Sequence, residues 1–161
     1  MKHLFLENET LSQAAIDAGI SDVYLYPETP STEITEYIQK SKLAKKLNIH
    51  SQWSVNEKTA MGAALGISYA GKRVMTVMKH AGLNVTPDVF MNMSVSGING
   101  GLVVVVADDP SMHSSQNEQD LRYYGRFALI PILAPSTQQK TYEIMRYAFD
   151  TGKKIASTLV T

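Results

Sequence analysis

Short apolar runs alternate along the chain with stretches in which apolar residues recur at helical spacing. The runs are rich in β-branched and aromatic residues and are bounded by glycine, proline or small polar residues, as is typical of strands. They predict strands over residues 22–26, 50–55, 73–78, 102–107, 128–133 and 154–160, of which 50–55 is the weakest. The run 102–107 (LVVVVA) is the clearest, because it is apolar throughout and therefore suits a central parallel strand buried on both faces.

Helical spacing and end signals predict the intervening helices. They are expected over residues 10–18, 30–47, 56–70, from 86 onward, 118–124 and 136–150. Thr29 before Pro30, Thr86 before Pro87, and Ser136 have the residue types of helix starts, whereas Gly19, Gly71 and Gly152 follow predicted helix ends. Gly62 and Gly66 lie inside the fourth helix, where each costs about 1 kcal/mol relative to alanine. Close approach of another surface, from this domain's own sheet, a partner or a ligand, would compensate that cost.

This alternation predicts an α/β fold with three layers, a mainly parallel sheet covered by helices on both faces, in a single domain spanning residues 1–161. In such folds ligands bind at the carboxyl ends of the strands. Residues 27–31, 79–84 and 108–117 fall there, and Glu57 follows the weak strand on the same edge. All are rich in groups that form hydrogen bonds, so this rim is either a site or a solvated edge.

Glu57 has two interpretations. Ser54 followed three residues later by Glu57, and then by an alanine-rich run, has the spacing of a capping box that opens a helix. Alternatively, a carboxyl group at a partly buried helix start could hold a proton against a ligand. The local spacing fits the first interpretation fully and does not exclude the second.

Composition limits the classes of partner. Fifteen Lys and Arg residues balance fifteen Asp and Glu residues, so no long-range field favours nucleic acid or an anionic membrane. The chain has no cysteine, which excludes disulfides, thiolate zinc sites and cysteine-ligated iron–sulfur clusters within these residues. Residues 1–9 resemble neither a signal peptide nor a membrane span, and a cytoplasmic location is expected.

Several familiar site motifs do not occur. The chain has no G-x-G-x-x-G motif after its first strand, no P-loop and no G-x-S-x-G elbow, so neither those nucleotide sites nor a serine hydrolase triad is supported. His3, His50, His80 and His113 show no ligand spacing with carboxylates. No metal site is therefore predicted.

Four stretches carry a resemblance to a known family. They are YPETPSTEI (26–34), WSVNEKTAMGAALGISYAGKR (53–73), VMKHAGLNV (77–85) and GGLVVVVADDPSMHSSQNEQD (100–120). In this order they resemble the N-terminal, pyrimidine-binding domain of the α subunit of indolepyruvate ferredoxin oxidoreductases, which depend on thiamine diphosphate. The resemblance implies the thiamine diphosphate-binding fold and the oxidative decarboxylation of an aryl 2-oxoacid to its acyl-CoA.

The resemblance also implies roles for individual residues. Glu57 would be the catalytic glutamate, which meets N1′ of the cofactor's aminopyrimidine and shares a proton with it. Thr29, Pro27 and Asn84 would contact the cofactor. Thr29 would also contact the 2-oxoacid, together with Lys79 and His80.

Members of this family normally continue into a domain that binds the cofactor diphosphate and Mg²⁺, and then into a cysteine-rich segment. This chain alone is therefore expected neither to bind thiamine diphosphate tightly nor to turn over. Its partner would be a diphosphate-binding domain or subunit in a homo- or hetero-oligomer. Iron–sulfur clusters, coenzyme A and ferredoxin as electron acceptor would belong to the complete enzyme only.

Two alternatives remain open from the sequence. The small subunit of a non-oxidative 2-oxoacid decarboxylase of the sulfopyruvate type is also a pyrimidine domain of about this length, and its glutamate would have the same role. A catalytically silent module could instead dock a partner through the helix face that carries Gly62 and Gly66.

Overall fold

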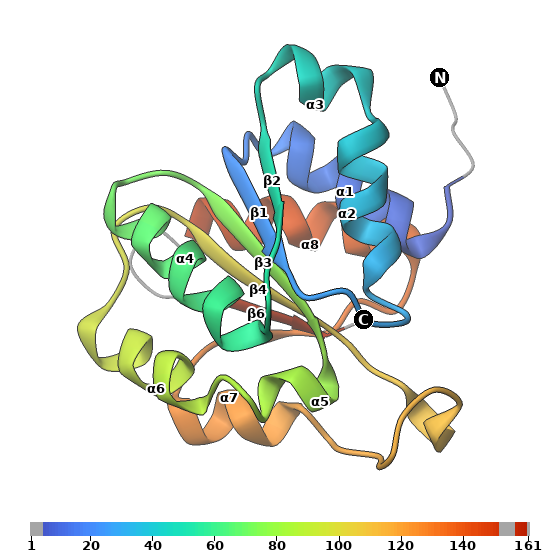
Figure 1. Ribbon diagram of the computed structural model, residues 1–161, viewed down its shortest axis with the longest axis vertical. Coiled ribbons are helices and arrows are strands. Elements are labelled where there is room, and N and C mark those ends of the chain that lie inside the picture. Colours follow the sequence, from blue (N-terminus) through green and yellow to red (C-terminus); the bar gives the residue numbers. More distant parts are fainter. Residues whose placement is uncertain (1–4, 152–156, 161) are drawn as a thin grey trace.

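A parallel sheet of six strands forms the centre of the computed structural model, which describes residues 5–151 and 157–160 (Figure 1). The strands are β1 (Asp22–Leu25), β2 (His50–Trp53), β3 (Val74–Lys79), β4 (Leu102–Ala107), β5 (Ile132–Leu133) and β6 (Ser157–Val160). Their order is β2-β1-β3-β4-β6-β5, and every hydrogen-bonded pair is parallel. The predicted α/β fold with a parallel sheet is confirmed.

Helices cover both faces of the sheet (Figure 1). One face packs against α1 (Glu7–Asp17), α2 (Thr32–Lys40), α3 (Lys42–Lys46) and α8 (Gln138–Thr151). The other packs against α4 (Glu57–Tyr69), α5 (His80–Leu83), α6 (Pro87–Ser96) and α7 (Arg122–Ala128). In β4, Val103 and Val105 point into the first core, with Phe149, whereas Val104 points into the second, with Phe90. This alternation explains why the predicted strand is apolar throughout.

The predicted second helix is divided in two. Instead of one helix over residues 30–47, α2 ends at Lys40 and α3 begins at Lys42. Ser41 separates them in an extended conformation, and its hydroxyl accepts a hydrogen bond from the N–H of Ala44 at 3.3 Å. Thr29 was predicted to be the N-cap of this helix, and that prediction is wrong. Because α2 begins only at Thr32, its N-cap is Ser31.

Three other predicted boundaries are wrong. Residues 79–84 were expected to be a loop, but 80–83 form the short helix α5. The helix expected over 118–124 is α7, which starts at Arg122 after Asp120 accepts a hydrogen bond from the Arg122 N–H. The strand expected over 128–133 is reduced to β5, because Ala128 ends α7 and Leu129 adopts a left-handed conformation. Gly152 and the first part of the strand predicted over 154–160 lie outside the described residues.

Gly62 and Gly66 lie on an uncovered part of α4. Both are exposed, and a Cβ atom at either position would meet nothing within 4 Å among the described residues. Packing against the domain's own sheet therefore does not account for these two glycines. Contact with a partner, as the docking hypothesis requires, stays untested.

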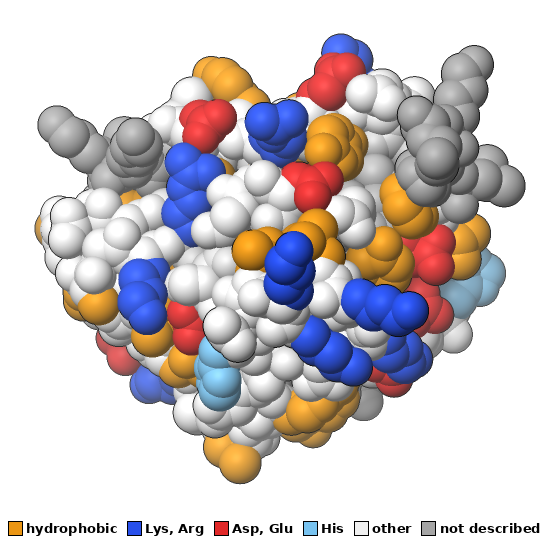
Figure 2. All heavy atoms as spheres, turned by 90° about the horizontal axis from the view of Figure 1, so that it is seen from above, with side chains coloured by type: hydrophobic (Ala, Val, Ile, Leu, Met, Phe, Trp, Pro, Cys, Tyr) orange, Lys and Arg blue, Asp and Glu red, His pale blue; other side chains and the backbone are white. Residues whose placement is uncertain are grey.

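The surface is mixed in charge. In the view of Figure 2 positive side chains gather at the lower right, but acidic and hydrophobic side chains lie beside them. No helix in the described part of the chain has both the length and the apolar character needed to cross a membrane.

Candidate active site

The strand order creates a topological switch point between β1 and β3. From β1 the chain continues to β2 on one side, whereas β3 lies on the other side and leads to β4. The segments after β1 and β3 therefore diverge at the carboxyl edge, where open α/β sheets form ligand crevices. The α4 helix, which connects β2 to β3, packs on β1 and β3 and begins at the same edge.

Glu57 is the first residue of α4 and is buried, with 5% of its surface exposed. The predicted capping box is wrong, because Asn56 is the N-cap. Asn56 has extended backbone angles (φ −163°, ψ 172°), and its side chain accepts a hydrogen bond from the N–H of Thr59 at 2.8 Å. The Ser54 hydroxyl is buried without a partner among the described residues. Glu57 is thus free of the capping role and lies inside the protein.

Gly82, in α5, packs directly on the Glu57 side chain. A Cβ atom at position 82 would lie 2.7 Å from Cγ of Glu57 and 2.8 Å from its Oε1. Carbon atoms do not approach so closely without displacement, so only glycine leaves the carboxyl group in this place. The glycine in the KHAGLN segment therefore positions Glu57.

A second carboxyl group, that of Glu28, lies against Glu57. Glu28 follows β1 and is half-buried. Burial, followed by the influence of the Glu57 carboxyl group, raises the pKa of Glu28 to about 7, although the Lys79 ammonium and backbone N–H act in the opposite direction. The Oε2 atom of Glu28 is buried and has no partner within the described chain.

The side chain of Lys79, at the end of β3, is bonded to the long connection that follows β4. Its ammonium donates hydrogen bonds to the carbonyl and the hydroxyl of Ser114, and lies 3.7 Å from Oδ2 of Asp109. Asp109 also accepts hydrogen bonds from the Ser115 hydroxyl and from the backbone N–H groups of Ser114 and His113. These bonds hold the pKa of Asp109 well below its usual range. Lys79 is therefore buried and already engaged.

His80 is fully buried beside this connection. Its Nε2 lies 2.9 Å from the carbonyl oxygen of Asn117, so the ring donates its Nε2–H to that oxygen. Its Nδ1 is buried without a hydrogen-bond partner among the described residues, and Oδ1 of Asp108 lies 3.9 Å away. One ring nitrogen of His80 therefore has no hydrogen-bond partner in the described part of the chain.

The remaining predicted residues divide into two groups. Thr29 and Pro27 are exposed in the turn after β1, and the Thr29 carbonyl accepts a hydrogen bond from the Ser114 hydroxyl at 3.4 Å. This bond links the turn to the Lys79 cluster. Asn84 lies beyond the far end of α5 and is exposed, and its Oδ1 accepts a hydrogen bond from the Tyr124 hydroxyl on α7. The structure thus brings Thr29, Lys79 and Glu57 to one edge and engages Asn84 with α7.

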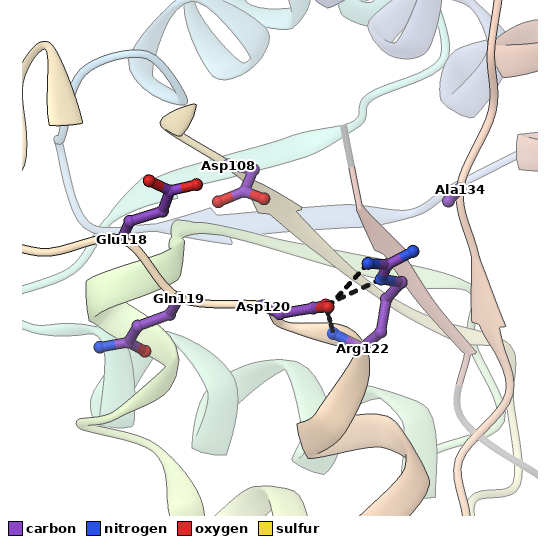
Figure 3. A pocket seen from close by; sticks show the side chains of 6 residues that line it. All are labelled: Asp108, Glu118, Gln119, Asp120, Arg122 and Ala134. Carbon is purple, nitrogen blue, oxygen red and sulfur yellow. Dashed lines mark hydrogen bonds and ion pairs between the residues drawn. The ribbon is translucent and has the colours of Figure 1, made fainter. Parts of the chain in front are cut away.

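An open hollow of about 320 Å³ adjoins this edge (Figure 3). It is lined by Asp108, Glu118, Gln119, Asp120, Arg122 and Ala134. Arg122 forms hydrogen bonds of 2.8 and 2.7 Å with the two carboxylate oxygens of Asp120, which lowers the Asp120 pKa. Its charge is therefore already paired. Among the described residues, no group of three His, Cys, Asp or Glu side chains has an arrangement that could hold a metal ion.

Two residues of the site were missed from the sequence, namely Glu28 and Asp109. Glu28 stands in the variable position of the YP-x-TPS element, and its sequence neighbours give no indication of burial against α4. Asp109 is the second residue of the polar connection 108–117, and three hydroxyl residues follow it within six positions, which is a pattern that could have indicated a hydrogen-bonded turn.

Comparison with known families shows to which family the chain belongs. Residues 13–160 match the family described as pyruvate flavodoxin/ferredoxin oxidoreductase, thiamine diphosphate-binding. The chain belongs to this family. The predicted resemblance is confirmed. In this member of the thiamine diphosphate-binding family, Glu57 is buried at the start of α4, at the carboxyl edge of the sheet.

Curated relatives show which members of the family the chain resembles. The chain is 48% identical over 159 residues to the indolepyruvate oxidoreductase subunit IorA of Pyrococcus horikoshii, which covers 99% of this chain and 24% of that protein. It is 42% identical over 161 residues to IorA of Archaeoglobus fulgidus, covering 99% of this chain and 26% of that protein. The chain thus spans about a quarter of the length of these relatives.

A solved structure supports the fold. The 2-oxoglutarate:ferredoxin oxidoreductase of Magnetococcus marinus, solved with 2-oxoglutarate, coenzyme A and succinyl-CoA bound, superimposes with a TM-score of 0.75. The match covers 98% of this chain and 28% of that one, at 18% sequence identity. The arrangement of strands and helices is therefore that of a domain found in a 2-oxoacid oxidoreductase.

If Glu57 has the predicted catalytic role, replacing Gly82 with alanine is expected to lower the kcat of the assembled enzyme by about tenfold to a hundredfold, since a small displacement of a catalytic group has effects of this size. The added methyl group would push the Glu57 side chain away from its position. Steady-state kinetics and a thermal unfolding curve, recorded for the same preparation, separate this effect from misfolding. Ala81→Gly on the same helix provides a control for backbone loosening, and equal losses in both variants would argue against a steric effect on Glu57.

Proposed function

We propose that this chain supplies the aminopyrimidine site of a thiamine diphosphate-dependent 2-oxoacid ferredoxin oxidoreductase of the indolepyruvate type. The observation that carries the proposal is the buried Glu57 carboxyl group at the start of α4, on the ligand-binding edge of a chain in the thiamine diphosphate-binding family. A carboxyl group in this setting can hold a proton against a ring nitrogen.

The residues present fit an aminopyrimidine. Such a ring carries both hydrogen-bond acceptors and N–H donors, and the edge offers both kinds of counterpart. Glu57 can donate or accept at its carboxyl group, and the buried Oε2 of Glu28 is an acceptor without a partner in the described chain. Thiamine diphosphate, when bound, supplies the nucleophilic carbon and the electron sink that decarboxylation of a 2-oxoacid requires.

The other residues of this edge would bind and orient. Thr29 and Pro27, in the turn that the Ser114 hydroxyl ties down, would lie beside the cofactor, and Thr29 would also meet the 2-oxoacid. Lys79 and His80 would face the substrate carboxylate, with Lys79 exchanging its Ser114 contacts for those of the ligand. Asn84 has the weakest support, because its amide oxygen is bonded to Tyr124 on α7.

The complete enzyme needs more than this chain. The chain, as the pyrimidine domain, would join a diphosphate-binding domain or subunit that holds Mg²⁺, in a homo- or hetero-oligomer. Iron–sulfur clusters must lie elsewhere, because these residues include no cysteine. An aryl 2-oxoacid such as indolepyruvate would be oxidised to its acyl-CoA, with ferredoxin as electron acceptor. The 48% identity to an indolepyruvate oxidoreductase subunit favours this substrate class over the non-oxidative sulfopyruvate alternative.

The proposal is tested with the complete enzyme, thiamine diphosphate, Mg²⁺ and coenzyme A. Indolepyruvate is expected to drive reduction of ferredoxin or of a viologen dye, with one acyl-CoA formed for each CO₂ released. Sulfopyruvate serves as the comparison substrate. Release of CO₂ without reduction of the acceptor would establish the non-oxidative decarboxylase instead, and absence of thiamine diphosphate binding would leave the silent docking module.

A further inference from the structure

We propose that Ser54 is a further cofactor-binding residue, and that its hydroxyl forms a hydrogen bond with the aminopyrimidine beside Glu57. This inference rests on the proposed function, because it assigns one more contact at the same site. Two observations carry it. The Ser54 side chain is buried, and its hydroxyl has no partner among the described residues.

The burial of Ser54 reverses the pattern expected for its neighbours. Successive side chains of an extended segment point to opposite sides, and apolar side chains are normally the ones that turn inward. Here the apolar Trp53 and Val55 are 39% and 81% exposed, whereas Ser54 between them is only 9% exposed. Hydrophobic burial therefore does not explain why the serine occupies the inward position.

The Ser54 hydroxyl has no structural task within the described chain. A buried hydroxyl without a hydrogen bond has lost its contacts with water and gained nothing in return, so such groups are rare in folded proteins. A serine just before a helix often caps it, but Asn56 caps α4 by accepting a hydrogen bond from the Thr59 N–H at 2.8 Å. The Ser54 backbone N–H is bonded separately, to the Leu25 carbonyl at 2.7 Å. The side chain thus remains available to a ligand.

Ser54 lies on the edge where the ligand is expected. It follows β2 directly, and its bond to the Leu25 carbonyl places it beside the end of β1. Glu57 begins α4 three residues later and is also buried. A second buried polar atom without a partner in the described chain, Oε2 of Glu28, belongs to the segment after β1. Unpartnered polar atoms therefore follow two paired strands, β1 and β2, at the edge where Glu57 is buried.

A hydroxyl suits an aminopyrimidine, because it can both donate and accept a hydrogen bond. The ring nitrogens and the amino group of the cofactor offer counterparts of both kinds. Glu57 would exchange the proton at one ring nitrogen, so the Ser54 hydroxyl would contribute to binding and orientation of the ring. Its loss is therefore expected to weaken affinity for the cofactor.

Ser54→Ala in the complete enzyme tests this contact through binding. Isothermal titration calorimetry with thiamine diphosphate and Mg²⁺ is expected to give a Kd about three- to tenfold higher than in the unchanged protein, the effect of one neutral hydrogen bond. The Kd for inorganic pyrophosphate with Mg²⁺ should stay the same, because this probe has no pyrimidine. Urea unfolding of the cofactor-free variant should show no loss of stability, since the removed hydroxyl has no partner in the described chain.

Ser51→Ala is the matched control. It removes a partly exposed hydroxyl from β2 itself, three residues before Ser54, and should leave both Kd values unchanged.

The inference and the proposed function fail separately. An unchanged Kd for thiamine diphosphate in Ser54→Ala would overturn the inference and leave the proposed function intact. A less stable cofactor-free variant with an equal rise in both Kd values would also overturn it, because the hydroxyl would then stabilise the protein itself, through a bound water. If the unchanged protein does not bind thiamine diphosphate, both the inference and the proposed function fall.

Discussion

Replacing Glu57 with glutamine is expected to lower kcat for 2-oxoacid oxidation in the assembled enzyme by about 10²–10⁴-fold, the range that general acid–base catalysis contributes. Glutamine keeps the size of the side chain and can still form hydrogen bonds, but it cannot exchange a proton. The measurement is steady-state reduction of the electron acceptor at saturating 2-oxoacid and thiamine diphosphate. Saturation ensures that a weaker Kd for the cofactor is not mistaken for slower chemistry.

Stability provides the control for Glu57→Gln. The variant removes the acidic residue from the first turn of α4, which costs about 0.3–1 kcal/mol, but it also removes the carboxyl group that raises the pKa of Glu28. The free energy of unfolding should therefore change little. Glu36→Gln on α2 changes an exposed carboxylate in the same way and should keep full activity. An unchanged kcat in Glu57→Gln would exclude Glu57 as the acid of the site and would leave a docking role for this chain.

The sequence predicted the strands best where a single local signal dominates. β4 was predicted at its observed bounds because its valines form a continuous apolar run after a pair of glycines. β5 was predicted too long, because Ala128 and Ile130 are buried like strand residues while lying at the end of α7 and just beyond it. Helices and strands both bury apolar residues, so hydropathy could not distinguish the end of α7 from the start of a strand.

The arrangement of the site depends on tertiary contacts, which cannot be inferred from local sequence patterns. Ser54 and Asn56 are both good N-cap residues, and only the extended backbone at Asn56 decides which of them caps α4. The catalytic role of Glu57 was predicted from the family resemblance, whereas its packing against Gly82 is seen only in the folded chain. Glu28 was missed altogether, because its environment is made by α4 and β3, which follow it in the sequence.

Gly100 occupies the tightest backbone crossing that a glycine makes in the described chain. A Cβ atom at position 100 would lie 2.6 Å from the carbonyl carbons of Gly71 and Lys72, and closer still to the Lys72 carbonyl oxygen. Two hydrogen bonds of 2.6 Å hold this crossing together. The Gly100 N–H donates to the Ser68 carbonyl, and the buried Ser68 hydroxyl donates to the Gly100 carbonyl. The turn before β4 is thereby fixed to the end of α4.

Gly100→Ala is therefore expected to lower the free energy of unfolding by about 2–4 kcal/mol, because backbone atoms must separate and both bonds to Ser68 weaken. Urea denaturation with a common m-value measures the loss. Gly62→Ala is the matched control, since its Cβ meets nothing within 4 Å in the interior of α4, and it should stabilise the chain by about 0.5–1 kcal/mol. A loss of stability in the isolated chain at Gly62 would contradict the open space found there. Loss of that gain only in the assembled enzyme would instead identify this face of α4 as the surface that a partner covers.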